Sequence, residues 1–239
     1  MTRPTIVLLP GLDGTGTLFR PILPELDMVA RTMVVRYPAD EPLGYGELLE
    51  LVLDALPQDE PFYLLGESFS GPLAIRAAAT RPQNLRGLIL IATFARKPWP
   101  WVPAWIASLV RAPLFRVYPP FKALKALIGN RGNADLHGLT REALAQFHPA
   151  TLARRAREVL RVNVSADLRK CAVPVLYLAG ERDPLIGKHN AREISQLTAA
   201  FTLRSLPCSH LVLQSEPRAA AQAIADFMTQ EQSGGHDGQ

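Results

Sequence analysis

The sequence feature that most constrains the fold is a strand, a tight turn and a helix centred on Ser68. An apolar run at residues 62–65 predicts a buried strand, and a helical pattern begins at Gly71. In the turn between them, the residues two before and two after Ser68 are Gly66 and Ser70, which are both small. Small residues are needed there because the strand and helix backbones nearly touch. The pattern is typical of a nucleophile elbow, although an ordinary glycine- and serine-rich turn is the simpler alternative.

Strand and helix patterns alternate on both sides of this turn. Short apolar or β-branched runs predict buried strands at residues 5–9, 32–37, 62–65, 85–93, 174–179 and 201–206. Apolar residues at helical spacing predict helices at residues 45–56, 71–80, 190–197 and 217–228. This alternation predicts an α/β fold built on a mostly parallel, doubly wound sheet.

A long insertion interrupts the alternation after the fourth predicted strand. Residues 96–161 contain all three tryptophans and many prolines, with helical segments expected near residues 104–110, 115–127 and 141–159. We therefore expect residues 1–95 and 162–229 to form the core domain. Residues 96–161 are expected to form a helical cap over the carboxyl edge of the sheet, and the polar residues 230–239 a disordered tail.

Composition narrows the class of protein further. A chain of 239 residues, 48% apolar and 20% charged, suits one α/β domain with a sizeable core. The two cysteines, Cys171 and Cys208, provide neither a disulfide framework nor the spacing of metal ligands. The N-terminal apolar run at residues 5–9 is too short for a signal peptide or a membrane span. We expect a soluble cytoplasmic protein without stable membrane insertion, metal or organic cofactor.

Two further residues complete a chemical pattern with Ser68. A serine hydroxyl is a weak nucleophile unless a general base lies within hydrogen-bond reach, and that base needs an orienting acid. In a parallel sheet these groups converge when each follows the carboxyl end of its strand. Asp183 follows the strand predicted at residues 174–179, and His210 follows the strand predicted at residues 201–206. The chain order serine, aspartate, histidine is one that serine hydrolases use.

Both assignments have simpler alternatives. Asp183 precedes Pro184 and could be only a turn residue, and Asp167 is another candidate acid, although it precedes its strand. His210 could be an ordinary loop histidine. The other histidines are less suited, because none of them follows a strand beyond the acid: His137, His148, His189 and His236.

The first predicted strand leads into a glycine-rich loop at residues 11–16, GLDGTG. Its spacing matches neither a dinucleotide-binding fingerprint nor a P-loop, which disfavours a nucleotide site. In a serine hydrolase this loop would turn the backbone N–H of Leu12 toward the carbonyl oxygen of the substrate. The N–H of Phe69 would be the second donor of this oxyanion hole. A plain strand–helix turn is the alternative.

Four segments together resemble the α/β-hydrolase fold serine hydrolases, in their capped carboxylesterase branch. They are residues 8–14 (LLPGLDG), 66–71 (GESFSG), 175–183 (VLYLAGERD) and 209–217 (SHLVLQSEP), which match the oxyanion loop, elbow, acid strand and histidine loop. The resemblance implies a serine carboxylesterase that forms an acyl-enzyme on Ser68. Three positions depart from the family's usual residues: Pro10, where histidine is usual, and Ser70 and Ser209, where glycine is usual.

The aromatic residues of the insertion are candidates for a substrate pocket. An apolar cap over Ser68 would form a pocket for an acyl group or an alcohol, and we name Trp99, Trp105 and Phe147 as candidate substrate-binding residues. The alternative is that these side chains only pack the cap helices onto the sheet.

The basic residues of the chain are concentrated in the same insertion. Residues 96–161 hold twelve lysines and arginines against three acids, while the remainder of the chain is net acidic. Such an excess is usually a solvated surface, but it allows an anionic partner such as an acidic carrier protein. The pimeloyl-acyl-carrier-protein methyl ester esterases, which take such a carrier, resemble this chain in size and cap placement. Nucleic acid is not an expected partner.

Two classes of function follow from these observations. The first is hydrolysis of small to medium carboxylic esters, and the same residues would also serve a methyl ester esterase acting on acyl carrier protein, a thioesterase or an acyltransferase. The second is a non-catalytic ligand-binding protein on the same fold. An interrupted Ser–Asp–His set would indicate the second class, and this sequence retains all three residues.

Overall fold

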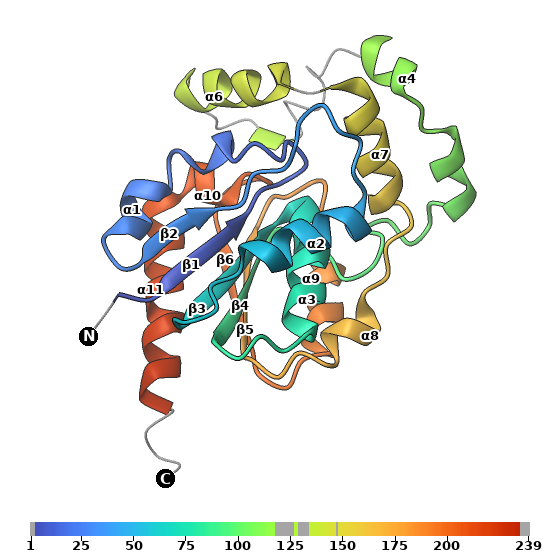
Figure 1. The fold of residues 1–239 in the computed structure, drawn as a ribbon. Helices are drawn as coiled ribbons and strands as arrows, with labels where there is room; N and C mark the ends of the chain where they lie inside the picture. Colours follow the sequence, from blue (N-terminus) through green and yellow to red (C-terminus); the bar gives the residue numbers. More distant parts are fainter. Residues whose placement is uncertain (1–2, 118–126, 129–133, 147, 235–239) are drawn as a thin grey trace.

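A single parallel sheet forms the centre of the protein. The computed structural model describes residues 3–117, 127–128, 134–146 and 148–234. Across these residues six strands, all parallel, lie in the order β2-β1-β3-β4-β5-β6 (Figure 1). The strands are β1 (Thr5–Leu9), β2 (Arg31–Val34), β3 (Phe62–Glu67), β4 (Leu85–Ile91), β5 (Val175–Gly180) and β6 (Phe201–Leu206). The predicted parallel α/β sheet is confirmed.

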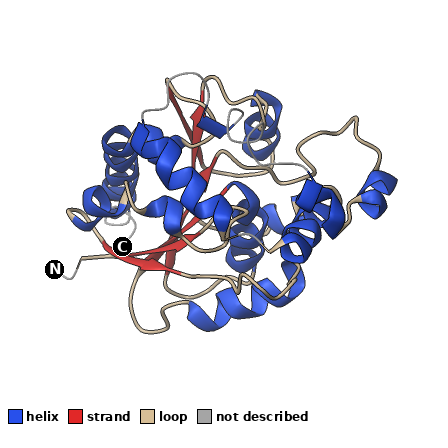
Figure 2. Ribbon diagram, turned by 90° about the horizontal axis from the view of Figure 1, so that it is seen from above, coloured by secondary structure: helices blue, strands red, loops and turns tan. Residues whose placement is uncertain are grey.

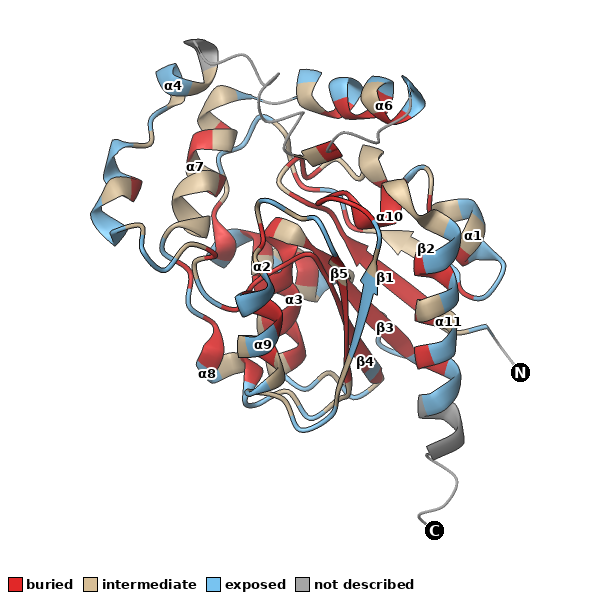
Figure 3. Ribbon diagram, turned by 180° about the vertical axis from the view of Figure 1, so that it is seen from behind, coloured by how far each residue is buried: buried red, intermediate tan, exposed pale blue. Residues whose placement is uncertain are grey.

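Helices cover both faces of this sheet (Figure 2). Side chains alternate along the strands, so that Val7 and Leu9 enter one apolar cluster while Ile6 and Leu8 enter the other. The first cluster is covered by α2 (Tyr45–Ala55), α3 (Gly71–Ala79), α8 (Ser165–Leu168) and α9 (Lys188–Ser195). The second is covered by α1 (Leu23–Asp27), α10 (Val212–Ser215) and α11 (Pro217–Gly234). Figure 3 shows that the central strands β1, β3, β4 and β5 are buried between these layers, as expected of a doubly wound sheet, whereas the edge strands β2 and β6 are partly exposed.

Several predicted element boundaries were wrong. Strand β2 ends at Val34 rather than at residue 37, because the chain turns toward the glycine-rich loop, where the Tyr37 N–H donates to the Gly14 carbonyl at 2.7 Å. Helix α11 continues to Gly234, past residue 228, where the sequence pattern ended it. The short 3₁₀ helix η1 (Thr17–Phe19) and α1 were not predicted, because neither is long enough to show a helical period.

The insertion between β4 and β5 lies over the carboxyl ends of the strands (Figure 1). It contains the 3₁₀ helix η3 (Ala104–Leu109), α4 (Ala112–Val117), α6 (Ala134–Ala145) and α7 (Pro149–Val159). The chain leaves and re-enters the core at adjacent points. There the Lys97 N–H donates to the Val162 carbonyl at 2.9 Å, and the Val164 N–H donates to the Ala95 carbonyl at 2.8 Å. No helix in the described part of the chain is both long and apolar enough to cross a membrane.

Two predicted helices of the insertion differ from the structure. The helix predicted at residues 141–159 is wrong, since α6 ends at Ala145 and α7 begins at Pro149. Proline lacks the N–H that a continuing helix needs and disfavours helical geometry in the preceding residue. His148 accordingly has an extended backbone, with φ −85° and ψ 126°. The helix predicted at residues 115–127 overlaps α4 only up to Val117, and most of its remainder lies outside the described residues.

Candidate active site

Ser68 lies at the end of β3 in a strained turn. Its φ is +49°, a left-handed backbone conformation that costs a residue with a Cβ roughly 1–3 kcal/mol. The turn brings β3 against α3 so closely that a Cβ on Gly66 would lie 2.7 Å from the Ser70 carbonyl oxygen. A Cβ on Gly71 would collide with Thr93. The geometry explains why small residues flank Ser68, and it leaves that side chain only partly buried.

The structure brings Ser68, His210 and Asp183 into one chain of hydrogen bonds. His210 Nε2 lies 2.9 Å from Ser68 Oγ, and His210 Nδ1 lies 2.7 Å from Asp183 Oδ2. Since a carboxylate only accepts hydrogen bonds, Nδ1 carries the imidazole proton and Nε2 is left to accept the Ser68 hydroxyl proton. His210 is 5% exposed, so bulk water has little access to this chain.

Asp183 is fixed by the loop that follows β5. Its other carboxylate oxygen, Oδ1, accepts backbone N–H groups from Leu185 at 2.8 Å and Ile186 at 3.0 Å. The two carboxylate oxygens therefore have separate partners, one facing the backbone and the other facing His210. This arrangement holds the imidazole in a single orientation.

The alternative acid and bases lie elsewhere. Asp167 is in α8 and forms a surface ion pair with Lys170 at 3.5 Å. His189, in α9, lies with Nε2 3.0 Å from the Pro98 carbonyl oxygen. Neither residue is part of the hydrogen-bonded chain that contains Ser68 and His210.

The glycine-rich loop presents the N–H of Leu12 on its outer side. The Gly11 carbonyl accepts the Gly14 N–H at 3.1 Å and so points into the turn. Because a trans peptide directs its C=O and N–H in opposite directions, the Leu12 N–H points away from that turn. The loop also lies against the nucleophile, since a Cβ on Gly11 would be 3.9 Å from the Cβ of Ser68.

The N–H of Phe69 is oriented by the same principle. The Ser68 carbonyl accepts hydrogen bonds from the Gly71 N–H and the Thr93 hydroxyl, so the Phe69 N–H on the opposite side of that peptide points away from both. The Phe69 ring stacks on Tyr45 at a centroid distance of 4.7 Å, and the Tyr45 hydroxyl donates to the Phe69 carbonyl at 2.8 Å. Among the described residues, neither the Leu12 N–H nor the Phe69 N–H has a hydrogen-bond acceptor.

Ser70 has a role beyond its small size. Its buried hydroxyl donates to the Pro10 carbonyl, and the Tyr37 hydroxyl lies 2.7 Å from the same Ser70 oxygen. Because that serine proton is already used, Tyr37 is the donor of the second bond. Burial raises the pKa of Tyr37 well above its ordinary value, which keeps this donor protonated. Ser70 thus joins the turn at Ser68 to the glycine-rich loop, a contact that its size alone did not predict.

Glu67 is a buried carboxyl group directly before Ser68. It is 3% exposed, and burial raises its pKa to about 7. Its Oε1 accepts the side-chain amide of Gln214 at 2.8 Å. Among the described residues, two buried oxygens have no hydrogen-bond partner, Glu67 Oε2 and Gln214 Oε1. Both are acceptors when Glu67 is ionised, whereas a protonated Glu67 would supply the missing donor. Gln214 lies four positions after His210, in α10, so this hydrogen bond joins the residue before Ser68 to the segment that follows His210.

Glu67→Gln is expected to change how stability depends on pH. The folded protein holds the Glu67 proton up to about pH 7, whereas an unfolded glutamate releases it near 4.5, so this group makes stability fall as pH rises between those values. The substitution should remove that slope and raise stability at pH 8 by up to about 3 kcal/mol. Urea unfolding from pH 5 to pH 8 would measure it, with exposed Glu50→Gln as the control. Parallel curves for wild type and Glu67→Gln would contradict a protonated Glu67.

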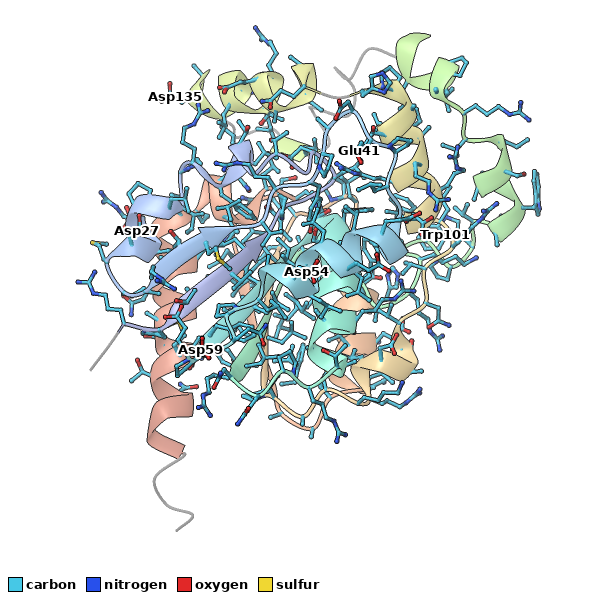
Figure 4. The ribbon with its side chains drawn as sticks, in the orientation of Figure 1. Asp27, Glu41, Asp54, Asp59, Trp101 and Asp135 are labelled. Atoms are coloured by element: carbon cyan, nitrogen blue, oxygen red, sulfur yellow. The ribbon has the colours of Figure 1, made fainter. Side chains whose placement is uncertain are left out.

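The structure describes two of the three candidate substrate-binding residues of the insertion, Trp99 and Trp105. Trp99 is partly buried and donates its indole N–H to the Leu185 carbonyl at 3.1 Å, next to the loop that holds Asp183. Trp105 is 64% exposed, so it does not line a closed pocket in this structure. Phe147 lies outside the described residues. Trp101, labelled in Figure 4, is also exposed.

The basic residues of the insertion do not form a uniformly free surface. Arg154 is partly buried and pairs with Glu158 at 3.3 Å, and Arg155 is buried, so the free basic surface is smaller than the charge count suggested. The count alone could not show this, because it carries no information on burial. Among the basic side chains that the structure describes, exposed ones in or next to the helices of the insertion include Arg111, Arg141 and Arg161.

Neither cysteine provides a second nucleophile. Burial raises the pKa of both Cys171 and Cys208 to about 12, so both thiols stay protonated near neutral pH. Across the described residues, no cluster of three or more histidine, cysteine or carboxylate side chains could bind a metal ion.

Comparisons with known proteins agree with this fold. A model of the alpha/beta hydrolase family matches residues 6–223. A pimeloyl-[acyl-carrier protein] methyl ester esterase of Edwardsiella ictaluri is 27% identical, over 93% of this chain and 92% of that protein. The protein of the same name in Xanthomonas oryzae is 30% identical, over 84% and 86%. The crystal structure of an enol-lactonase from Burkholderia xenovorans superposes with a TM-score of 0.76 at 20% identity, over 96% and 92%. The chain belongs to the alpha/beta hydrolase family.

Proposed function

We propose that this protein is a serine carboxylic ester hydrolase with Ser68 as nucleophile, His210 as general base and Asp183 as the orienting acid. The observation that carries the proposal is the unbroken chain of hydrogen bonds from Ser68 Oγ through His210 to Asp183 Oδ2, with distances of 2.9 and 2.7 Å. A non-catalytic binding protein has no need to keep a strained serine in line with an oriented imidazole. The family membership and the names of the relatives agree with a hydrolase.

The reaction would proceed through an acyl-enzyme. Ser68 Oγ attacks the ester carbonyl while His210 Nε2 takes the hydroxyl proton, and the carbonyl oxygen becomes an oxyanion that the N–H groups of Leu12 and Phe69 stabilise. The C–O bond to the alcohol then breaks as His210 returns the proton to the leaving oxygen. A water molecule then attacks the acyl carbon and gives a proton to His210. The bond between the acyl carbon and Ser68 Oγ breaks as His210 returns that proton to Oγ, which releases the acid and restores Ser68.

A finer candidate is hydrolysis of a methyl ester carried by an acidic acyl carrier protein. Two observations favour it: relatives of this name align along most of the chain, and the insertion, which lies over the carboxyl ends of the strands, retains exposed arginines. Attraction between exposed charges of opposite sign would raise the rate of encounter with such a carrier. Neutral esters of small alcohols would lack this attraction.

A substrate panel tests both levels of the proposal. It contains p-nitrophenyl and methyl esters of rising acyl chain length, and the methyl ester of a dicarboxylic acyl group on acyl carrier protein. Arg111→Glu combined with Arg141→Glu is expected to lower kcat/KM for the carrier-bound ester about fivefold, equivalent to two exposed ion pairs of about 0.5 kcal/mol each. The effect should weaken as salt is added, because salt screens exposed charges.

The control for this panel is Arg86→Glu, which reverses an exposed charge at the amino end of β4, opposite to the Ser68 edge. Arg86→Glu should leave kcat/KM unchanged for every substrate of the panel. An equal response of p-nitrophenyl acetate and the carrier-bound ester would contradict carrier recognition, whereas failure to hydrolyse any ester, together with failure of Ser68 to react with a fluorophosphonate, would contradict the esterase proposal itself.

A further inference from the structure

Arg155 is a buried cation that reaches from the insertion into the core. It belongs to α7, yet it is only 1% exposed. Its Nη1 donates to the Leu12 carbonyl at 2.8 Å, and its Nη2 donates to the Pro38 carbonyl at 3.0 Å. Removing a cation from water costs several kcal/mol unless close partners replace the water. A buried arginine on a cap helix therefore points to a specific role.

The site around Arg155 is shaped for a guanidinium group. The guanidinium carbon lies 5.6 Å from the centroid of the Tyr37 ring and 5.9 Å from that of Phe69, within range for cation–π attraction. Gly14 has a φ of +72°, and a Cβ at that position would collide with the guanidinium. The buried carboxyl of Asp13 supplies a negative charge nearby without forming an ion pair. Two aromatic faces, two carbonyls and a glycine thus enclose one side chain.

Arg155 holds the loop that carries the Leu12 N–H. Three consecutive carbonyls of this loop each accept a hydrogen bond: Pro10 from the Ser70 hydroxyl, Gly11 from the Gly14 N–H, and Leu12 from Arg155. The first two donors belong to the core, whereas Arg155 belongs to the insertion. The same guanidinium also lies over the ring of Phe69, the residue with the second outward-pointing N–H. Arg155 therefore contacts both residues whose amides would form the oxyanion hole.

We propose that Arg155 is a positioning residue that couples the seating of α7 to the formation of the oxyanion hole. With α7 seated, Arg155 fixes the Leu12 carbonyl and thereby the direction of the turn that presents the Leu12 N–H beside Ser68. When α7 moves away, the loop loses this anchor while the serine and histidine keep their contacts. The inference rests on the proposed esterase function, because it assigns Leu12 and Phe69 to the stabilisation of an oxyanion.

The test compares Arg155→Met with Arg157→Met on the same helix. Methionine retains apolar packing but donates no hydrogen bond. Loss of one aligned oxyanion donor typically lowers kcat by about 10²–10³-fold, so Arg155→Met should lower kcat about 100-fold with KM changed little. Arg157 anchors α7 to the Val110 carbonyl at 2.9 Å, within the insertion, so Arg157→Met should retain kcat within about threefold. The kcat of Arg155→Lys should lie between those of the wild type and Arg155→Met, because one ammonium group replaces a guanidinium that bonds two carbonyls.

A second readout separates positioning from general stability. A trifluoromethyl ketone forms a tetrahedral oxyanion on the serine. Its inhibition constant should therefore rise in Arg155→Met by the same factor by which kcat/KM falls. A purely structural role would lower the melting temperature and leave both constants of the folded enzyme unchanged. That result, or an equal loss of kcat in Arg157→Met, would overturn the proposal. If Arg155→Met does not fold, the same two constants measured in Arg155→Lys decide, and wild-type values there overturn it.

Amide hydrogen exchange keeps this inference distinct from the proposed function. In the variants of Arg155, exchange should rise at residues 11–15, and in Arg157→Met it should stay at the wild-type level there. This measurement needs no substrate. If the wild type hydrolyses no ester but the exchange pattern holds, the esterase function fails while the anchoring of the loop stands. Unchanged exchange at residues 11–15 in Arg155→Lys and Arg155→Met would overturn the anchoring.

Discussion

Ser68→Ala is expected to lower kcat for ester hydrolysis by about a millionfold while the fold stays intact. The loss is large because the serine oxygen is the atom that bonds to the acyl group, and knocking out the nucleophile of a Ser–His–Asp set typically removes about 10⁶-fold of the rate. Alanine also carries a Cβ, so it meets the same backbone strain at φ +49° and should not change the turn. Steady-state kinetics on a short p-nitrophenyl ester would measure the loss of kcat, and circular dichroism would show whether the fold stays intact.

The matched control is Ser108→Ala, which removes an exposed hydroxyl that donates to the Trp105 carbonyl within the insertion. It should hydrolyse the ester at the wild-type rate and react with a fluorophosphonate as the wild type does. Retention of more than about a hundredth of the wild-type kcat in Ser68→Ala would show that another group is the nucleophile, because no remaining feature of the site replaces a covalent bond.

The core of the candidate site was predictable because parallel topology brings strand ends together. Ser68, Asp183 and His210 each follow a strand whose apolar run is visible in the sequence, and the carboxyl ends of parallel strands lie at one edge of a sheet. The steric demand of the turn could likewise be inferred from Gly66 and Ser70. In these cases the strand and turn patterns of short segments were sufficient, because the parallel sheet itself brings the ends of those strands together.

The contacts that support this site could not be predicted, because they join residues far apart in the chain. Arg155 meets a carbonyl 143 positions earlier, and neighbouring arginines gave no sign of which one is buried. Arginine is seldom fully buried, so charge counting placed it on the surface. The bond from Ser70 to the Pro10 carbonyl spans 60 positions and depends on how β1 and β3 lie in register. The sequence shows that Ser70 is small, but not what its hydroxyl contacts.

Asp183→Asn is expected to lower kcat about 10⁴-fold, through the tautomer of His210 rather than through loss of charge alone. Oδ1 of Asp183 accepts the N–H groups of Leu185 and Ile186, so asparagine must place its carbonyl oxygen there. Its NH₂ group then faces His210 Nδ1 and donates to it. The imidazole proton is thereby moved to Nε2, which can no longer accept the proton of Ser68.

A wrong tautomer should make Asp183→Asn at least as damaging to kcat as Asp183→Ala, an order that loss of charge alone does not produce. Asp183→Ala leaves His210 free to choose its tautomer, so it should retain at least as much kcat as Asp183→Asn, although it should be less stable because two backbone N–H groups lose their acceptor. Asp167→Asn, at the surface pair with Lys170, should keep the wild-type kcat. Higher activity in Asp183→Asn than in Asp183→Ala would contradict the tautomer argument. The histidine would then depend on Asp183 mainly for placement, since an asparagine held by the same two N–H groups would still place the ring.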